Sequence, residues 1–570
     1  MLLDQVAKDK ALPGAASAAD GAAPSILDLW RRNGPGLLDT HRAEYRALLA
    51  PVAPLIASGR FSEATAAAQV AANHAVLWHH GRFACPELED ALARIGAAAL
   101  PHPGSPRTAA TGRALNVLHV ATEVYAIGGH SRLAEQWMRE DGASRHSLVL
   151  TRQRGPIPAS TTDAVSAAGG TVVVLNRTAG SLLDWAGRLQ SEMARADVVV
   201  LHVHSMDVLP FIACAGMARR PPMLFVNHSD HLFFVGARFA DLVVCTRRSG
   251  HRLCIDRRGI PAERLALLPL CLGEEAPQAD RAAARATLGL ARDDVMILTV
   301  ARGVKFAPVG HEAFPDPFVE LLQRNPHVRL VAVGPGGEVD WSAAEAAVPG
   351  RIQAIAATRE TARYFAAADI YLDSFPFVSI TSLLEAGRAG LPMVTRNPFG
   401  PDCAVMGADT IGFDASIVRS SSTAEMVATL QRLIDDAALR RQIGEAARTE
   451  IAALNGGDGW RRELATLHAR ALALPATPPP CTPDLGSPSD LDSFLPFVYG
   501  DQGRGATAAS RLEAAMGASI KAGPLAWRLR SVAELRRHGV APGRGQVVRW
   551  CTPEWVTSRL RDFQRRGSRA

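Results

Sequence analysis

The sequence contains no apolar run that approaches the ~20 residues a helix needs to cross a bilayer. Its opening stretch, MLLDQVAKDKALPGAASAADGAAP, mixes charged and small residues and lacks the basic-then-apolar order of a secretory signal. These absences predict a protein of the cytoplasm whose fold is preceded by a disordered leader.

Cysteine is scarce, and none of the eight cysteines belongs to a CxxC pair. Several of them interrupt strand-like apolar runs, such as FIAC ending at Cys214 and LVVC ending at Cys245. Buried thiols acting as small hydrophobes explain this pattern better than disulfides or a metal site. The sequence also lacks GxGxxG, which disfavours a dinucleotide redox site.

Residues 25 to about 100 are predicted to be helical, because apolar positions recur at helical spacing between Ala43 and Asn73. The stretch GRFSEATAAAQVAA resembles one tetratricopeptide-type helical hairpin, but it occurs once, and such solenoids need about three repeats to be stable. We therefore expect a helical cap and assign residues 1–110 to a helical N-terminal domain.

After the linker-like stretch PHPGSP, apolar runs alternate with helical segments. Runs that are apolar throughout, joined by helical crossovers, indicate a parallel sheet covered on both faces. The first series of predicted strands comprises Asn116–Ala121, His146–Leu150, Thr171–Leu175, Val198–Leu201, Met223–Val226, Leu242–Cys245 and Arg264–Leu268.

A second series of such runs comprises Val295–Val300, Val328–Val333, Arg351–Ile355, Asp369–Asp373 and Pro392–Thr395. The polar segment GEEAPQAD between the two series suits a hinge, and a helix over 459–474 is expected to end the second domain. The sequence thus predicts an α/β fold with two tandem Rossmann-like doubly wound domains, residues 111–275 and 276–475. In such sheets ligands bind beyond the carboxyl ends of the strands, so we expect a cleft between the domains.

Residues 476–570 are predicted to be a Pro-rich linker followed by a small helical extension. From residue 501 onward there are fourteen basic and five acidic residues, a balance of +9 that exceeds the +6 of the whole chain. Such a segment could meet an anionic membrane surface or an acidic acceptor, or could simply be solvated. The sequence has none of the nucleic-acid-binding motifs, so we expect no nucleic acid partner.

The segment YLDSFPFVSITSLLEAGRAGLPMVTR, from Tyr371 to Arg396, reads as strand, Pro-broken loop, helix and strand. A loop before a helix N-terminus is a natural seat for phosphate, because free N–H groups and the helix dipole face the ligand together. Ser379, Thr381 and Ser382 add hydroxyl groups at the start of this helix.

Arg302 and Lys305 follow the strand MILTV, where a second-domain strand opens toward the expected cleft. Two cations there could neutralise a diphosphate leaving group, although a surface Arg–Lys pair is an equally good interpretation of the spacing alone. Gly334 opens a Gly-rich turn after another strand, and Gly128 and Gly129 form a strand-to-helix turn that lets backbone approach a ligand.

His202 and His204 end the strand VVVLHVH, and His228 ends PMLFVNH, followed by Asp230 and His231. A histidine at such a position could serve as a general base near neutral pH. Zinc binding by these histidines is the less favoured alternative, since the ligands would need one closed cluster. We expect no metal.

These segments resemble GT-B glycosyltransferases over roughly Leu115 to Leu474. The Gly128–Gly129 turn resembles the glycine loop that abuts the donor phosphates and the acceptor. PMLFVNHSDH resembles the segment whose histidine faces the donor sugar, which implies His228 as the first catalytic candidate and His204 as the second.

The resemblance to the group 1 glycosyltransferases implies that Arg302 and Lys305 hold the phosphates and that Glu385, in LLEAGRAGLPMV, contacts the nucleotide ribose. That family has a second glutamate eight positions earlier, where this chain has Phe377. The spacing of Arg302 and Lys305, the form KFAP and the loop LDSFPF are more similar to the protein O-linked N-acetylglucosamine transferases. Retention or inversion of stereochemistry stays open.

The function implied is transfer of a hexosyl or N-acetylhexosaminyl group from a nucleoside-diphosphate sugar to a polysaccharide, lipid-linked or protein acceptor. Because arginine, lysine and a helix dipole can carry the leaving-group charge, no metal cofactor is expected. The DxD triplet 490–492 lies outside both predicted sheets. A catalytically inactive scaffold of the same fold and a sugar-nucleotide 2-epimerase are the alternatives. The basic C-terminal segment is compatible with peripheral contact at the inner membrane face.

Overall fold

The structure is a computed structural model that describes residues 25–102, 113–126, 129–273, 279–309, 312–409, 411, 416–474, 481, 488–499 and 506–567. The predicted leader and most of the three predicted linkers lie outside these ranges.

Four helices form the N-terminal part of the described chain, as predicted. The first begins after Ser25, whose side chain accepts a hydrogen bond from the Asp28 N–H group. The third is alanine-rich and buried along most of its length, so it forms the centre of this layer. These helices are α1 (Ile26–Leu49), α2 (Val52–Ala57), α3 (Phe61–Leu77) and α4 (Pro86–Ala99).

The first sheet has seven parallel strands in the order β3-β2-β1-β4-β5-β6-β7. Its first six strands have the order of a Rossmann sheet. Burial on both faces explains why its central strands are apolar throughout. The strands are β1 (Asn116–Ala121), β2 (Arg145–Leu150), β3 (Val172–Val174), β4 (Val198–His202), β5 (Met223–Asn227), β6 (Leu242–Cys245) and β7 (Leu265–Leu267).

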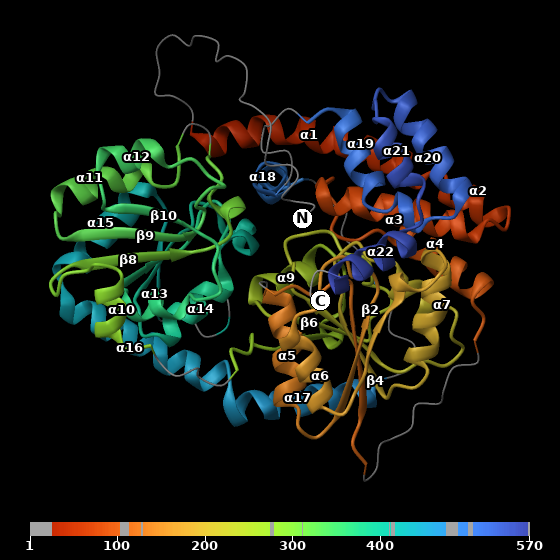
Figure 1. The fold of residues 1–570 in the computed structure, drawn as a ribbon, viewed down its shortest axis with the longest axis horizontal. Helices are drawn as coiled ribbons and strands as arrows, with labels where there is room; N and C mark the ends of the chain where they lie inside the picture. Colours follow the sequence, from red (N-terminus) through yellow and green to blue (C-terminus); the bar gives the residue numbers. More distant parts are fainter. Residues whose placement is uncertain are drawn as a thin grey trace.

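The second sheet has six parallel strands in the order β10-β9-β8-β11-β12-β13. Its strands are β8 (Val295–Val300), β9 (Val328–Gly334), β10 (Ile352–Ala356), β11 (Ile370–Leu372), β12 (Met393–Arg396) and β13 (Ile417–Ser420). The last strand was not predicted, because IVRS is short and only half apolar. The α/β prediction of two Rossmann-like domains is confirmed, and Figure 1 shows the two domains side by side.

Helices cover both sheets. Those of the first domain are α5 (Gly129–Glu140), α6 (Ala159–Ala167), α7 (Leu182–Met193), α8 (Leu209–Ala215) and α9 (Arg248–Asp256). Those of the second are α10 (Arg281–Thr287), α11 (Asp316–Arg324), α12 (Ser342–Ala347), α13 (Ala362–Ala367), α14 (Ile380–Arg388), α15 (Thr423–Asp435) and α16 (Ala437–Leu454).

The helix predicted to end the second domain packs on the first instead. This helix, α17 (Gly457–Ala473), buries Trp460, Leu464 and Leu467 in the same apolar cluster as residues of β1, β4 and β5. The Trp460 indole N–H donates to the carbonyl of Pro269 at 2.8 Å. The chain therefore crosses back to the first domain, as Figure 1 shows along its lower edge.

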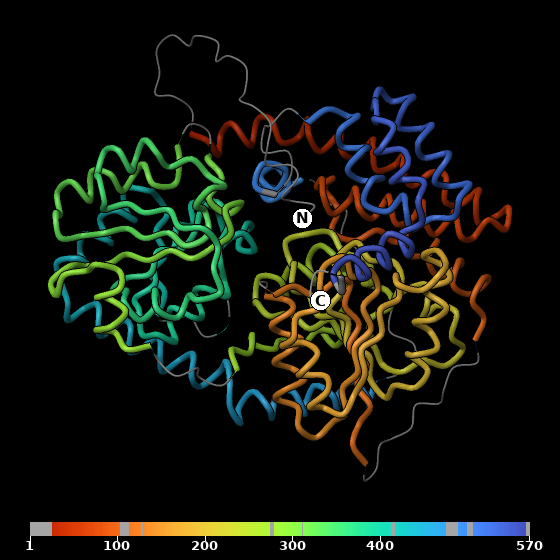
Figure 2. Tube along the Cα trace, in the orientation of Figure 1, coloured from red at the N-terminus to blue at the C-terminus, as the bar shows by residue number. Residues whose placement is uncertain are grey.

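The C-terminal extension packs against the N-terminal helices. Its helices are α18 (Asp490–Tyr499), α19 (Ala508–Gly517), α20 (Leu525–Arg537), α21 (Arg544–Cys551) and α22 (Glu554–Gly567). α18 lies along α1, and α19 lies on α3. Figure 2 shows these blue C-terminal helices beside the red N-terminal ones. The two ends of the chain thus form one helical layer.

All eight cysteines are free, and six of them are buried, as the sequence indicated. Within the described part of the chain, no helix combines the length and apolarity needed to span a bilayer. The cytoplasmic location stays a prediction.

Candidate functional site

The two domains meet at the N-terminal ends of α5 and α14. A Cβ atom added to Gly129 would lie 3.0 Å from the Thr381 hydroxyl oxygen, so glycine permits this close approach. One turn further along each helix, Arg132 forms an ion pair with Glu385. Gly129, Thr381 and Glu385, all predicted site residues, therefore come together at the junction, whereas Gly128 lies outside the described residues.

Lys305 lies in the short 3₁₀ helix η4 (Gly303–Phe306) that follows β8. Its Nζ donates to the carbonyl of Val378 at 2.8 Å and lies 4.5 Å from the centre of the Phe377 ring. Burial lowers the pKa of Lys305 to about 8, although the carboxylate of Asp373 opposes this shift. A lysine held at the loop before α14 can neutralise an anion there.

Asp373 is a site residue that the sequence analysis missed. It follows β11 directly and is buried, and its Oδ1 accepts from the N–H groups of Ser374 and Ser379, both at 2.9 Å. Its Oδ2 accepts from the Thr395 hydroxyl at 3.2 Å. Burial raises the pKa of Asp373 to about 6. This carboxylate holds the loop before α14 in place. The position of Asp373 at a strand's carboxyl end was the signal in the sequence that could have indicated a site residue.

The start of α14 carries the predicted hydroxyl residues. The Ser379 hydroxyl donates to the Ser382 hydroxyl at 3.1 Å, and its side chain does not cap the helix. The N–H groups of a first helical turn have no acceptor within the helix. With nine residues, α14 is long enough for its dipole to favour an anion at this end.

A groove of about 680 Å³ opens beside Glu385. Two carboxylates, Asp369 and Glu385, lie among its lining residues. Seven arginines also line the groove, so positive charges outnumber the two carboxylates: Arg132, Arg281, Arg359, Arg388, Arg440, Arg441 and Arg448. The groove is therefore strongly cationic and suits an anionic ligand.

The predicted catalytic histidines lie on the first-domain side. The His228 Nδ1 donates to the carbonyl of Val226 at 3.2 Å, which leaves its Nε2 as an acceptor. The ring of His228 stacks on His130, with centroids 5.3 Å apart, and His130 in turn contacts His204 edge-on at 5.7 Å. Burial lowers the pKa of His228 to about 3 and that of His204 well below its usual range.

Arg302 and Gly334 occupy different settings. Arg302 is exposed, and its charge lowers the pKa of both His130 and Lys305, burial being the larger cause in each case. It therefore lies near both His130 and Lys305. Gly334 has a φ of 121°, and a Cβ there would lie 1.8 Å from the carbonyl oxygen of Ala301. This close approach accounts for the glycine, and a ligand contact at Gly334 stays a prediction.

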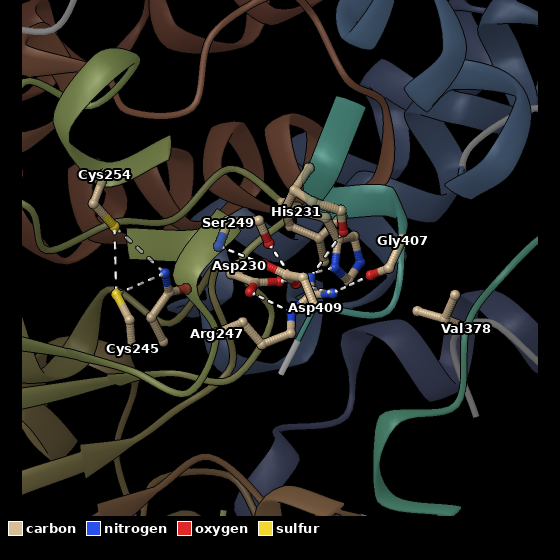
Figure 3. A network of polar contacts seen from close by, with 12 residues as sticks. Asp230, His231, Cys245, Arg247, Ser249, Cys254, Val378, Gly407 and Asp409 are labelled. Carbon is tan, nitrogen blue, oxygen red and sulfur yellow. Dashed lines mark hydrogen bonds and ion pairs between the residues drawn. The ribbon is translucent and has the colours of Figure 1, made fainter. Parts of the chain in front are cut away.

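A buried ion-pair network joins the two domains close to His228 in the chain (Figure 3). The sequence analysis did not predict it. Asp230 accepts two hydrogen bonds from Arg247, at 2.7 and 2.5 Å. Arg247 also donates to the carbonyls of Val405 and Gly407 in the second domain, both at 2.8 Å. Asp409, also in the second domain, accepts from the N–H and hydroxyl groups of Ser249.

This network fixes the segment of His228 to the second domain. Asp230 lies two residues after His228, and the Arg247 guanidinium holds its pKa far below the usual range in spite of burial. His231, the next residue after Asp230, contacts the Phe377 ring edge-on at 5.3 Å. The loop after β5 therefore touches the loop before α14.

Across the described ranges, no group of three or more His, Cys, Asp or Glu side chains converges to hold a metal ion.

The comparisons concern the fold. No protein-family model matches the sequence, and no curated protein matches it in sequence. Among solved structures, the chain is similar to Anabaena Alr3699/HepE in complex with UDP and glucose, with 14% identity over 62% of this chain and 99% of that chain and a TM-score of 0.48. It is also similar to a glycosyltransferase from Rickettsia africae (10% identity, 63% and 99% covered, TM-score 0.48). A third is a Thermobaculum terrenum O-GlcNAc transferase mutant (17% identity, 78% and 86% covered, TM-score 0.46).

Proposed function

We propose that this protein is a glycosyltransferase that moves a sugar from a nucleoside-diphosphate sugar to an acceptor hydroxyl without a metal cofactor. The observation that carries the proposal is the position of Lys305 at the loop before α14, against the Phe377 ring that His231 of the first domain also contacts.

In this proposal the second domain binds the donor. The diphosphate lies between Lys305, Arg302 and the first turn of α14, where N–H groups, hydroxyls and two cations share the leaving-group charge. The nucleoside continues from the diphosphate along α14, where Glu385 accepts hydrogen bonds from the ribose hydroxyls. Because these groups already carry positive charge toward the phosphates, the leaving group needs no divalent ion.

The first domain provides the acceptor side. The Nε2 of His228 is free to accept the proton of an incoming hydroxyl, because its Nδ1 is engaged by Val226. The acceptor itself is a polysaccharide, a lipid-linked glycan or a protein. If it is a lipid-linked glycan, we expect the basic C-terminal helices to contact an anionic membrane.

Donor hydrolysis and sugar transfer by the purified full chain test the proposal, with UDP-, GDP-, ADP- and dTDP-sugars as donors. We expect release of one nucleoside diphosphate and its loss in Lys305→Ala. Neither hydrolysis nor nucleotide binding with any donor would favour the inactive scaffold instead.

A further inference from the structure

The arginine-lined groove is distinct from the loop that holds Lys305. Its second-domain walls come from α10, α13, α14 and α16, which lie together at the lower side of that domain (Figure 1). Neither Lys305 nor any residue of the loop 373–379 lines it, and the residue it shares with the predicted donor site is Glu385. The groove is therefore a second concave site, and its volume of about 680 Å³ is typical of small-molecule sites.

The two carboxylates of the groove are already engaged by arginines. Asp369 accepts from the Arg281 guanidinium at 2.6 Å, and Arg281 also donates to two backbone carbonyls beside it. Glu385 forms the ion pair with Arg132. These carboxylates consequently leave most of the positive charge of the groove without a partner.

Three of the arginines have no carboxylate partner among the described residues. Arg359, after β10, and Arg441, on α16, are exposed and form no hydrogen bond or ion pair with any of these residues. Arg440 donates to two carbonyls in the last turn of α15, at 2.6 and 2.8 Å, which fixes its guanidinium but leaves its charge. Like charges gathered in a concave wall repel one another, and a bound anion would offset this repulsion.

The groove also reaches the contact between the two domains. Arg132 of the first domain pairs with Glu385, and its Nη2 lies 3.5 Å from the carbonyl oxygen of Leu272. The Arg388 Nη1 lies 3.4 Å from the same oxygen. An anion bound among the arginines would attract Arg132, and Glu385 would then be available to the ribose hydroxyls that we assign to it.

We propose that the groove binds a small soluble anion with several phosphate groups, and that this anion strengthens donor binding by drawing Arg132 away from Glu385. Guanidinium groups bind phosphate oxygens in pairs, and several phosphates on one molecule engage arginines from different elements at once. Binding in the groove is independent of the enzymatic reaction, whereas its effect on the donor rests on the proposed function. Because the pair is partly exposed, its release is expected to strengthen nucleotide binding by about two- to fivefold.

Calorimetric titration with tripolyphosphate tests the groove. The starting protein is full-length Lys305→Ala, which removes the other predicted phosphate site. We expect it to bind tripolyphosphate, and the added pair Arg359→Gln and Arg441→Gln to weaken the affinity about tenfold or more, because hydrogen bonds between charged groups are lost. The matched pair Arg195→Gln and Arg324→Gln, exposed and outside the groove, should leave the affinity unchanged. Absence of binding in Lys305→Ala, or equal affinity after the groove substitutions, would overturn the proposal.

Two further measurements concern the charge and the source of the ligand. Without ligand, Arg359→Gln with Arg441→Gln should raise the midpoint of thermal unfolding, because like charges are removed; a lower midpoint would contradict the unbalanced charge. Vesicles that contain phosphatidic acid carry phosphate in lipid form. Co-sedimentation with them that depends on these two arginines, without binding of tripolyphosphate, would assign the groove to a lipid surface and overturn the proposal.

Nucleotide titration with and without tripolyphosphate tests the coupling. At one concentration that saturates the groove of both proteins, tripolyphosphate should strengthen nucleotide binding about two- to fivefold more in the wild type than in Arg132→Gln. Competition at Lys305 is the same in both, so the difference measures coupling through the Arg132–Glu385 pair. Equal effects in the two proteins would overturn the coupling. Absence of nucleotide binding by the wild type rejects the proposed function instead, and the tripolyphosphate titration still decides the groove.

Discussion

Arg132 of the first domain and Glu385 of the second form an ion pair across the domain junction. Glu385 is the residue we assign to the ribose, so a bound donor must share this carboxylate with Arg132. Their side chains are 34% and 18% exposed, which limits the strength of the pair in the free protein.

We therefore expect unequal effects from the two partners of this pair. Glu385→Gln should weaken nucleotide binding by about tenfold or more, because hydrogen bonds to a charged acceptor contribute about 1.5–3 kcal/mol. Arg132→Gln should change both affinity and the unfolding free energy by less than about 1 kcal/mol. Calorimetric titration with the preferred nucleotide measures the affinity of both variants. A larger loss of affinity in Arg132→Gln than in Glu385→Gln would contradict the assignment.

Lys305 should be essential for turnover. Removing one preorganised group that stabilises a developing charge typically costs about 10²–10³ in rate, so we expect that loss in kcat for Lys305→Ala. Arg324, an exposed arginine at the end of α11, is the matched control, and Arg324→Ala should retain full activity. Equal kcat values for Lys305→Ala and the wild type would remove Lys305 from the site.

The Arg247 network should hold the two domains together. Arg247→Ala leaves Asp230 buried without its cation, and breaking a buried pair in this way costs about 3–5 kcal/mol. Asp409→Asn keeps the Arg247–Asp230 pair and should cost less. Thermal unfolding gives the stability order, and small-angle scattering reports domain separation. A smaller loss in Arg247→Ala than in Asp409→Asn would contradict this account.

Acid should release the C-terminal helices. Burial alone would raise the pKa of Glu554, but the charge and hydrogen bonds of Arg152 more than offset it and lower the pKa to about 2. A carboxylate with a lowered folded-state pKa stabilises the fold above its unfolded value of 4.5. That stabilisation is lost as the pH falls from about 4.5 toward 2.

Limited proteolysis between pH 6 and pH 3 measures this release. We expect cleavage of the C-terminal helices to increase as the pH falls in the wild type, and Glu554→Gln to be cleaved already at pH 6 with less dependence on pH. Glu513→Gln, on α19, is the control, because that side chain accepts from the neutral amide of Gln546. Identical pH profiles for Glu554→Gln and the wild type would contradict the anchoring role.

Much of the fold was predictable because parallel strands buried on both faces leave a continuous apolar signature. Asn116–Ala121 and Val295–Val300 match β1 and β8 residue for residue. The helix α17 was assigned to the wrong domain, because an amphipathic pattern shows that a helix has an apolar face but not which sheet covers it. Which sheet that face packs on is decided by tertiary contacts, here those of Trp460 and its neighbours with the first sheet.

The candidate site was predictable where one segment carries the chemistry. Lys305, Thr381 and Glu385 could be proposed from local pattern and resemblance, and their roles stay predictions. Asp373 carried one signal, its position at a strand's carboxyl end. Arg247 could not be found in that way, because its importance arises from burial and from partners in distant segments. The contacts of His119 with His146 and His202 were not predictable either, since the three residues come from separate strands.

The central claim is that the junction of the two domains binds a nucleoside diphosphate through Lys305 and α14. Calorimetric titration of the wild-type chain and of Lys305→Ala with UDP, GDP, ADP and dTDP tests it most directly. We predict saturable binding of one nucleotide to the wild type and at least a tenfold weaker affinity in Lys305→Ala. Binding of none of the four, or equal affinity in the two proteins, would contradict the account.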